Sequence, residues 1–274
     1  MICLSRRRVP PAGLPDGTKF LQANLLELQG LEPQLAGVET IIHLAAQTGK
    51  ARPGEYFRAN LEGTRQVVAL ARRVGIRRLL FVSTIAVRFP DKSRYPYARS
   101  KEQAEEIVRQ SGLRYVIVRP TLIIGPHGGA YTSLAKLARH GIVPVPGDGA
   151  ARVQPVHVED LVEFLVAIVE KDMFANQTLE LGGPEVVSIE ELLKKIHYRA
   201  CGTQARTIHI PMGLCLRVLS AMETVAFPVL PLTAGQLSTF RFDGVAETST
   251  MVGPRGPLKT LDQMLAARCA DDGL

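Results

Sequence analysis

The sequence has few cysteines, no long apolar run and no low-complexity tract, and each of these absences excludes a class of protein. The four cysteines have no paired spacing, which argues against a zinc site or a disulfide framework and suits a reducing cytosol. The basic first residues are followed by no apolar segment, so they do not form a signal peptide. The most apolar stretch, residues 213–232, contains Arg217, Glu223 and Pro228 and predicts a buried or amphipathic helix. We therefore predict a cytoplasmic protein with no integral membrane segment.

The charge pattern indicates no nucleic-acid interface. The net charge is +7 at pH 7, but lysines and arginines are spread along the chain and aromatic residues do not interleave with them. The 274 residues are enough for one large domain or for a domain with a small lobe. We expect a globular protein whose partner is a small-molecule substrate and that does not bind nucleic acid.

Short apolar runs alternate with amphipathic segments of helical length through the first part of the chain. The apolar runs predict buried strands at residues 2–4, 19–21, 41–45, 78–83 and 115–124. Helical spacing of apolar residues predicts helices over 60–74 and 101–110. Strands that are apolar throughout and separated by helices form a parallel sheet covered on both faces. The sequence therefore predicts the α/β class.

The last part of the chain is organised differently and predicts a smaller lobe. Apolar spacing predicts a helix over residues 158–169. Ser188 and Glu191 have the spacing of a capping box at the start of a further helix. We expect a first domain over residues 1–182 and a smaller mixed lobe over residues 183–274.

A tyrosine and a lysine four residues apart, Tyr97 and Lys101, carry the sharpest chemical signal. At the start of a helix such a pair lies on one face, and an ammonium near the phenol lowers the pKa of the tyrosine. This tyrosine can exchange a proton at a carbinol carbon while hydride moves to or from nicotinamide. The spacing is common by chance, and the alternative is a surface tyrosine beside a solvated lysine. The neighbouring strands make the arrangement far more specific. One strand before the pair ends in Ser83-Thr84, and one after it ends at residues 119–121.

Taken together, these segments resemble the extended short-chain dehydrogenases/reductases, the NAD-dependent epimerase/dehydratase family. The resemblance is carried by FVSTIAV, YPYARSKEQAE and VIVRPTLIIGP, with support from IIHLAAQTG, NLEGT and VPVPGDGAARVQPVHVEDLV. It covers roughly residues 1–210. It implies a Rossmann-type doubly wound parallel sheet, a small C-terminal substrate lobe and a nicotinamide dinucleotide cofactor.

The resemblance also implies roles for individual residues. Tyr97 would be the catalytic acid/base, Lys101 would tune it and bond the nicotinamide ribose, and Thr84 would be the catalytic hydroxyl, with Ser83 as its rival. Thr84 and His127 would contact the substrate, since His127 lies where substrate loops usually begin. The residues implied to contact the cofactor are Asn24, Leu44, Ala45, Ala46, Ser83, Tyr97, Lys101, Pro120 and Thr121. Arg119, Pro120 and Thr121 would flank the nicotinamide.

Three further polar residues in the matching segments are predicted to be structural. His43 is expected to be a hydrogen-bonded histidine at a strand end, and Asn60 is expected to brace the sheet through backbone hydrogen bonds. Asp160 is expected to be a carboxylate at a helix N-terminus, where the helix dipole favours it.

The sequence lacks the Gly-rich turn with which the family pattern opens. In similar proteins a G-x-x-G-x-x-G turn lets backbone N–H groups approach the pyrophosphate, and about thirty residues of that pattern have no counterpart here. We expect a sheet that lacks its first β-α unit. A start assigned too late or a truncation is one explanation and a real loss is the other, and the cost of exposing the neighbours of a central strand favours the first. Arg6, just after the first predicted strand, favours the 2′-phosphate of NADP, with NAD as second choice.

Two main functions remain open at this point. The first is an NAD(P)-dependent oxidoreductase, epimerase or dehydratase that acts at a hydroxyl or carbonyl carbon through Thr84, Tyr97 and Lys101. The second is a non-catalytic NAD(P)-binding or assembly protein of the same fold, because LTAGQLSTFRFDGVAETSTM vaguely resembles relatives of an accessory subunit of respiratory complex I. A regulator that senses the dinucleotide is a third alternative. Dimers through helices beside the Tyr97 helix are usual in similar proteins, so a homodimer is included among the expected partners.

Overall fold

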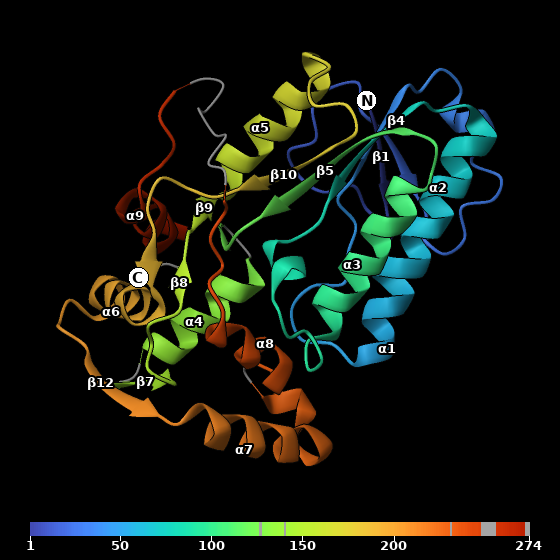
Figure 1. Ribbon diagram of the computed structural model, residues 1–274. Coiled ribbons are helices and arrows are strands. Elements are labelled where there is room, and N and C mark those ends of the chain that lie inside the picture. Colours follow the sequence, from blue (N-terminus) through green and yellow to red (C-terminus); the bar gives the residue numbers. More distant parts are fainter. Residues whose placement is uncertain (126–127, 140, 231, 248–255, 272–274) are drawn as a thin grey trace.

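A parallel sheet of four strands lies at the centre of the molecule (Figure 1). The computed structural model describes residues 1–125, 128–139, 141–230, 232–247 and 256–271. The strands run in the order β10-β5-β4-β3, with the bounds Gln177–Leu181, Arg114–Pro120, Arg78–Val82 and Thr40–His43. All three pairings are parallel, as the apolar runs predicted.

Helices cover both faces of this sheet. They are α2 (Gly63–Val74) and α3 (Pro96–Arg109) on one face and α5 (Val158–Glu170) on the other (Figure 1). Because side chains alternate along a strand, Leu79 and Phe81 of β4 pack toward α2 and α3, whereas Leu80 packs toward α5. This two-sided core confirms the Rossmann-type doubly wound sheet.

The first two strands, β1 (Ile2–Ser5) and β2 (Lys19–Gln22), form a separate parallel pair. Among the described residues, no strand pairing joins this pair to the four-stranded sheet. Ser5 and Gln22, at the carboxyl ends of the pair, and Leu44, just after β3, nevertheless line one cavity. The carboxyl ends of all three strands therefore face a common space.

A second core lies in the other lobe, beside the carboxyl end of β5 (Figure 1). Its helices and paired strands are α4 (Gly129–Ala138), β7 (Ile142–Pro146), α6 (Ile189–Cys201), β12 (Arg206–Ile210) and α9 (Leu261–Asp271). Leu134, Val143, Leu192 and Leu265 are among its buried residues. The boundary at residues 182–183 stays a prediction, and α4 and β7, which precede it, share this core with α6 and α9.

Shorter elements connect and close the two lobes. The remaining helices are α1 (Pro53–Tyr56), α7 (Met212–Val225) and α8 (Ala234–Ser238). The remaining strands are β6 (Ile123–Ile124), β8 (Arg152–Val153), β9 (Val156–His157) and β11 (Val187–Ser188). Single helical turns cover η1 (Glu32–Leu35), η2 (Phe57–Glu62), η3 (Ile85–Arg88), η4 (Phe227–Val229) and η5 (Thr239–Arg241). Within the described part of the chain, no helix has both the length and the apolar character needed to cross a membrane.

The sequence signals that predicted the start and the end of α6 are confirmed by the structure. The Ser188 hydroxyl accepts a hydrogen bond from the Glu191 backbone N–H at 3.1 Å, and the Glu191 carboxylate accepts one from the Ser188 N–H at 2.8 Å. This is the predicted capping box at the start of α6. Gly202 follows α6 with φ = +69°, a left-handed conformation that favours glycine at a helix C-terminus.

The apolar run at residues 115–124 does not form one strand, contrary to the prediction. β5 ends at Pro120, and β6 then pairs with β9 outside the central sheet. Thr121 makes the change of direction, because its N–H donates to the Leu181 carbonyl at 2.8 Å and its hydroxyl donates to the Gln154 carbonyl. Periodicity cannot detect such a bend, since both halves of the run are apolar.

Candidate active site

The residues predicted to carry the chemistry converge at the carboxyl ends of β4 and β5. Ser83 and Thr84 follow β4, Pro120 and Thr121 close β5, and Tyr97 lies in the first turn of α3. All five line one cavity of about 420 Å³. A cavity of this size suits a small-molecule ligand.

Tyr97 is partly buried in the wall of this cavity. Desolvation raises its pKa to about 12, and a hydrogen bond with the Thr84 side chain opposes this rise. The rings of Tyr95 and Tyr56 pack against it with centroid separations of 5.5 and 6.0 Å. The phenol therefore keeps its proton at neutral pH.

Lys101 lies one helical turn after Tyr97 and is completely buried, with 1% of its surface exposed. Its Nζ donates to the Val82 carbonyl at 2.7 Å and lies 4.0 Å from the centre of the Phe81 ring. Desolvation lowers its pKa to about 7, against the attraction of the Glu105 carboxylate. The Lys101 Nζ is directed at β4 and burial raises the pKa of Tyr97, so the lowering of the tyrosine pKa by Lys101 stays a prediction.

Asn60 is structural, as predicted. Its Oδ1 accepts the Gln47 N–H at 2.7 Å, and its Nδ2 donates to the Gln47 carbonyl at 3.2 Å and to the Ser100 hydroxyl at 2.9 Å. It thereby ties the segment after β3 to the helix that carries Tyr97 and Lys101.

The two other residues predicted to be structural also have partners in the fold. His43 is buried, and its Nε2 lies 3.0 Å from the Thr64 hydroxyl. Desolvation lowers the pKa of His43 to about 3, so the ring is neutral at physiological pH. Asp160, in the first turn of α5, accepts the Lys259 backbone N–H at 3.0 Å.

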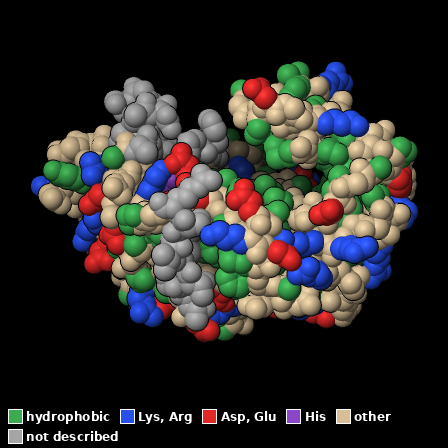
Figure 2. Space-filling model, turned by 90° about the horizontal axis from the view of Figure 1, so that it is seen from above, with side chains coloured by type: hydrophobic (Ala, Val, Ile, Leu, Met, Phe, Trp, Pro, Cys, Tyr) green, Lys and Arg blue, Asp and Glu red, His purple; other side chains and the backbone are tan. Residues whose placement is uncertain are grey.

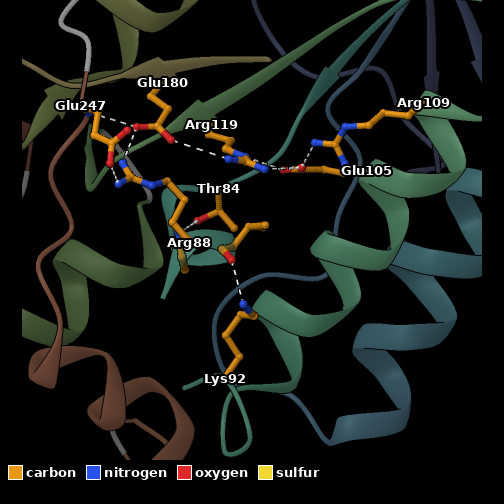
Figure 3. A network of polar contacts seen from close by, with 10 residues as sticks. Thr84, Arg88, Lys92, Glu105, Arg109, Arg119, Glu180 and Glu247 are labelled. Atoms are coloured by element: carbon orange, nitrogen blue, oxygen red, sulfur yellow. Dashed lines mark hydrogen bonds and ion pairs between the residues drawn. The ribbon is translucent and has the colours of Figure 1, made fainter. Parts of the chain in front are cut away.

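A buried ion-pair network, which the sequence patterns did not identify, lies beside the candidate site (Figure 3). Both carboxylate oxygens of Glu105 accept hydrogen bonds from Arg119, at 2.9 and 2.7 Å, and Arg109 donates to the same group at 2.6 Å. Arg119 continues to Glu180 at 3.6 Å, and Glu180 accepts from Arg88 at 2.6 Å. The network links α3, β5, β10 and the η3 turn after Thr84.

The same network corrects one expectation. Arg119 does not belong to the cavity lining, although Pro120 and Thr121 do, because its guanidinium is engaged by Glu105. The spacing of Glu105, four residues after Lys101, was the available signal, since it places the carboxylate on the same helix face.

The residues predicted for the other end of the cofactor line a second cavity, of about 920 Å³. Arg6, Asn24, Leu44, Ala45 and Ala46 are all in its wall, at the carboxyl ends of β1, β2 and β3. Apolar side chains, an amide and a guanidinium are the groups that an adenine ring and a ribose phosphate contact. The described residues therefore fit the adenosine half of a dinucleotide.

Two of the other expectations concern the substrate loop and the surface. His127 lies outside the described residues.

On the face shown in Figure 2, the coloured Lys and Arg side chains are interspersed with Asp, Glu and hydrophobic ones. The described residues of this face therefore present no continuous basic stripe of the kind that binds nucleic acid.

Comparison with known proteins shows the family and the fold of this chain. The sequence model of the NAD dependent epimerase/dehydratase family matches residues 1–182. The solved structure of MoeE5 in complex with UDP-glucuronic acid and NAD has a TM-score of 0.70 with this chain, at 19% identity, over 100% of this chain and 91% of that one. At this identity the likeness shows the shared fold.

Curated relatives are named for several activities. An N-acetyl-alpha-D-glucosaminyl-diphospho-ditrans,octacis-undecaprenol 4-epimerase of Escherichia coli O157:H7 is 25% identical over 86% of this chain and 80% of its own length. A ceramide reductase of Caulobacter vibrioides is 39% identical over 51% of this chain and 43% of its own. The mitochondrial NADH dehydrogenase [ubiquinone] 1 alpha subcomplex subunit 9 of Arabidopsis thaliana is 26% identical over 80% of this chain. The chain spans about half the length of the last two of these relatives, at 43% and 54%.

Proposed function

Since the chain belongs to the NAD-dependent epimerase/dehydratase family, we propose that it transfers hydride between a nicotinamide cofactor and a hydroxyl or carbonyl carbon of a small molecule. Thr84, Tyr97 and Lys101 are the residues proposed to carry the chemistry. The observation that best supports the proposal is the meeting of Tyr97 and Thr84 in the wall of one cavity, with Lys101 buried one helical turn away. A ceramide reductase among the relatives is consistent with carbonyl reduction.

The proposed chemistry assigns a separate task to each side chain. Tyr97 donates its phenolic proton to the carbonyl oxygen of the substrate, and the Thr84 hydroxyl donates a hydrogen bond to the same oxygen. A bound nicotinamide would supply the hydride to the carbonyl carbon. Lys101 holds the Val82 carbonyl and so positions the segment that carries Thr84 against α3. A tyrosine with a raised pKa is protonated at neutral pH and can supply the proton that carbonyl reduction needs.

Replacing Thr84 by valine is expected to lower kcat/KM for carbonyl reduction by about 100-fold, because one donor to the developing oxyanion is lost. The measurement is the oxidation of NADPH or NADH against a panel of carbonyl compounds. Thr84→Ser is the matched control, since it keeps the hydroxyl and also the acceptor for the Ala86 N–H at 3.3 Å. Equal activity of Thr84→Val and the unchanged protein would exclude Thr84, and Ser83→Ala would then test its rival.

We propose NADP(H) as the preferred cofactor, because Arg6 lines the cavity assigned to the adenosine half. Arg6→Ala is expected to raise the Kd for NADPH about tenfold or more and to leave that for NADH unchanged, since a charge-assisted contact to the 2′-phosphate is lost. Isothermal titration measures both constants. Arg7→Ala is the control, because Arg7 is adjacent in the chain but is not in the cavity wall. An equal loss for both cofactors would contradict a role in reading the 2′-phosphate.

A further inference from the structure

The cavity that holds Tyr97 is polar at one end and apolar elsewhere. Ser83, Thr84, Tyr97 and Thr121 supply hydroxyl groups where β4 and β5 end. The rest of the wall comes mainly from η3, the β6 region, α4 and residues 232–244, with Ile85, Leu122, Leu134, Leu232, Phe240 and Phe242 as its large apolar members. Among the described residues that line the cavity there is no lysine, arginine, histidine, aspartate or glutamate.

Two hydroxyls and one amide oxygen in this part of the wall already have hydrogen-bond partners within the fold. The Ser133 hydroxyl donates to the Gly129 carbonyl at 3.1 Å, and the Thr239 hydroxyl donates to the Gln236 carbonyl at 2.7 Å. The Gln236 side-chain oxygen accepts the Thr233 N–H at 2.9 Å. These three atoms therefore serve helix ends and turns within the fold.

Most basic residues next in sequence to lining residues are engaged within the fold, whereas the exposed Arg94, beside Tyr95, forms no ion pair or side-chain hydrogen bond among the described residues. Three arginines next to lining residues form ion pairs: Arg88–Glu180 at 2.6 Å, Arg152–Asp243 at 2.7 Å and Arg241–Asp91 at 3.8 Å. Lys50, which follows the lining residue Gly49, donates to three backbone carbonyls at 2.8 Å each. A diphosphate in this cavity would have to compete with these partners or stay unpaired, and an unpaired buried charge is costly.

We propose that the substrate of this site is a neutral ketone or secondary alcohol on an apolar chain, and not a nucleotide-sugar. The inference rests on the proposed function, because it places the carbonyl oxygen at Tyr97 and Thr84. The apolar chain then lies along the wall formed by Leu122, α4 and residues 232–244. In the reduction, the carbonyl carbon gains a hydride from the reduced nicotinamide and the oxygen gains the Tyr97 proton. The products are a secondary alcohol and the oxidised cofactor, and the phenolate recovers its proton from solvent.

The test is the binding of alkan-2-ones of increasing length, measured by isothermal titration without cofactor, with UDP-glucose as the charged probe. The Kd is expected to fall about fourfold for each added methylene until the cavity is filled, because each buried methylene contributes a similar free energy. UDP-glucose is expected not to bind. The same compounds are then offered as substrates with NADPH and with NADH.

Leu122→Gln and Leu214→Gln make a matched pair of variants for this test. Leu122 is partly buried in the cavity wall, whereas Leu214 is 47% exposed on α7 and is not part of the described lining. Leu122→Gln is expected to weaken binding of the longest ketone about tenfold and to leave the shortest one unchanged, since only the long chain reaches the new amide. Leu214→Gln is expected to change neither.

The outcomes separate the substrate class from the reaction. Chain-length-dependent binding without turnover supports an apolar-chain ligand for this cavity and overturns the proposed function. Binding or turnover of UDP-glucose, with no gain from longer ketones, overturns the substrate class and leaves the proposed function standing. If neither the alkan-2-ones nor UDP-glucose bind, both the proposed substrate class and the proposed function are overturned. Equal effects of Leu122→Gln and Leu214→Gln would also overturn the placement of the chain in this cavity.

Discussion

Tyr97→Phe is expected to lower kcat for carbonyl reduction by roughly 10²- to 10⁴-fold, because it removes the hydroxyl that donates the proton and keeps the aromatic ring. The phenylalanine ring keeps the packing against Tyr56 and Tyr95, whose ring centroids lie 6.0 and 5.5 Å away. The thermal unfolding midpoint should therefore stay close to that of the unchanged protein. Steady-state kinetics with NADPH, together with a thermal melt of both proteins, checks the two parts of the prediction.

Tyr95→Phe is the control for this substitution. Tyr95 lines the same cavity, and desolvation raises its pKa well above the usual value. Tyr95→Phe therefore shows what the loss of a phenol hydroxyl from this cavity does when that hydroxyl has no proposed catalytic role. Turnover is expected to survive in Tyr95→Phe. If Tyr97→Phe retains full turnover, the catalytic assignment is wrong. If no carbonyl compound or alcohol is turned over by the unchanged protein, the non-catalytic alternative becomes the better account.

The direction of the Tyr97 pKa shift adds a readout in pH. Proton abstraction from an alcohol needs the phenolate, and burial raises the pKa of Tyr97 to about 12. Alcohol oxidation should therefore accelerate as pH rises through the alkaline range, while the proton needed for carbonyl reduction is present at neutral pH. Loss of the alkaline rise in Tyr97→Phe would assign the rise to this phenol.

Glu105→Ala is expected to lower the free energy of unfolding by about 3–5 kcal/mol, the usual cost of removing one partner from a buried ion pair. Glu105 is fully buried and receives two hydrogen bonds from Arg119 and one from Arg109. Without the carboxylate, the Arg119 guanidinium between α3 and β5 loses its bidentate partner. Urea unfolding followed by circular dichroism measures the change.

Glu106→Ala is the matched control on the same helix. The Glu106 side chain is 57% exposed and its ion pair with Arg109 is long, at 3.7 Å, so its loss should cost about 1 kcal/mol or less. Equal effects of the two substitutions would contradict a special role for the buried network.

The pH dependence of stability tests the charge of Glu105 directly. Burial alone would raise the pKa of Glu105, but hydrogen bonds led by that from Arg119 outweigh burial and lower it below the usual 4.5. A carboxyl whose folded-state pKa is lowered contributes stability above its unfolded pKa, and this contribution is lost as pH falls. Glu105→Gln, which keeps the shape but not the charge, is therefore expected to lose less stability than the unchanged protein below about pH 4.5.

The sequence by itself determined the parts of this protein that depend on neighbours along the chain. Apolar runs and helical spacing predicted the five main strands of the first half and the α2, α3 and α5 helices, because burial on both faces of a parallel sheet leaves a local pattern. The Ser188–Glu191 capping box was readable for the same reason, since its hydrogen bonds join residues three apart. The Tyr97–Lys101 spacing placed the candidate chemistry on one helix face.

Only the tertiary structure decided the properties that depend on burial and on partners far apart in the chain. The pKa of Tyr97 rises because walls from several elements desolvate it, and Lys101 turns to the Val82 carbonyl instead. The partner of Arg119 is Glu105, fourteen positions earlier, and the spacing of Glu105 from Lys101 indicates its helix face but not this partner. The apolar part of the cavity wall combines residues from separate segments between 48 and 244, and no local pattern indicates that they meet. Desolvation and charge pairing act through space, so folding alone brings these residues into one site.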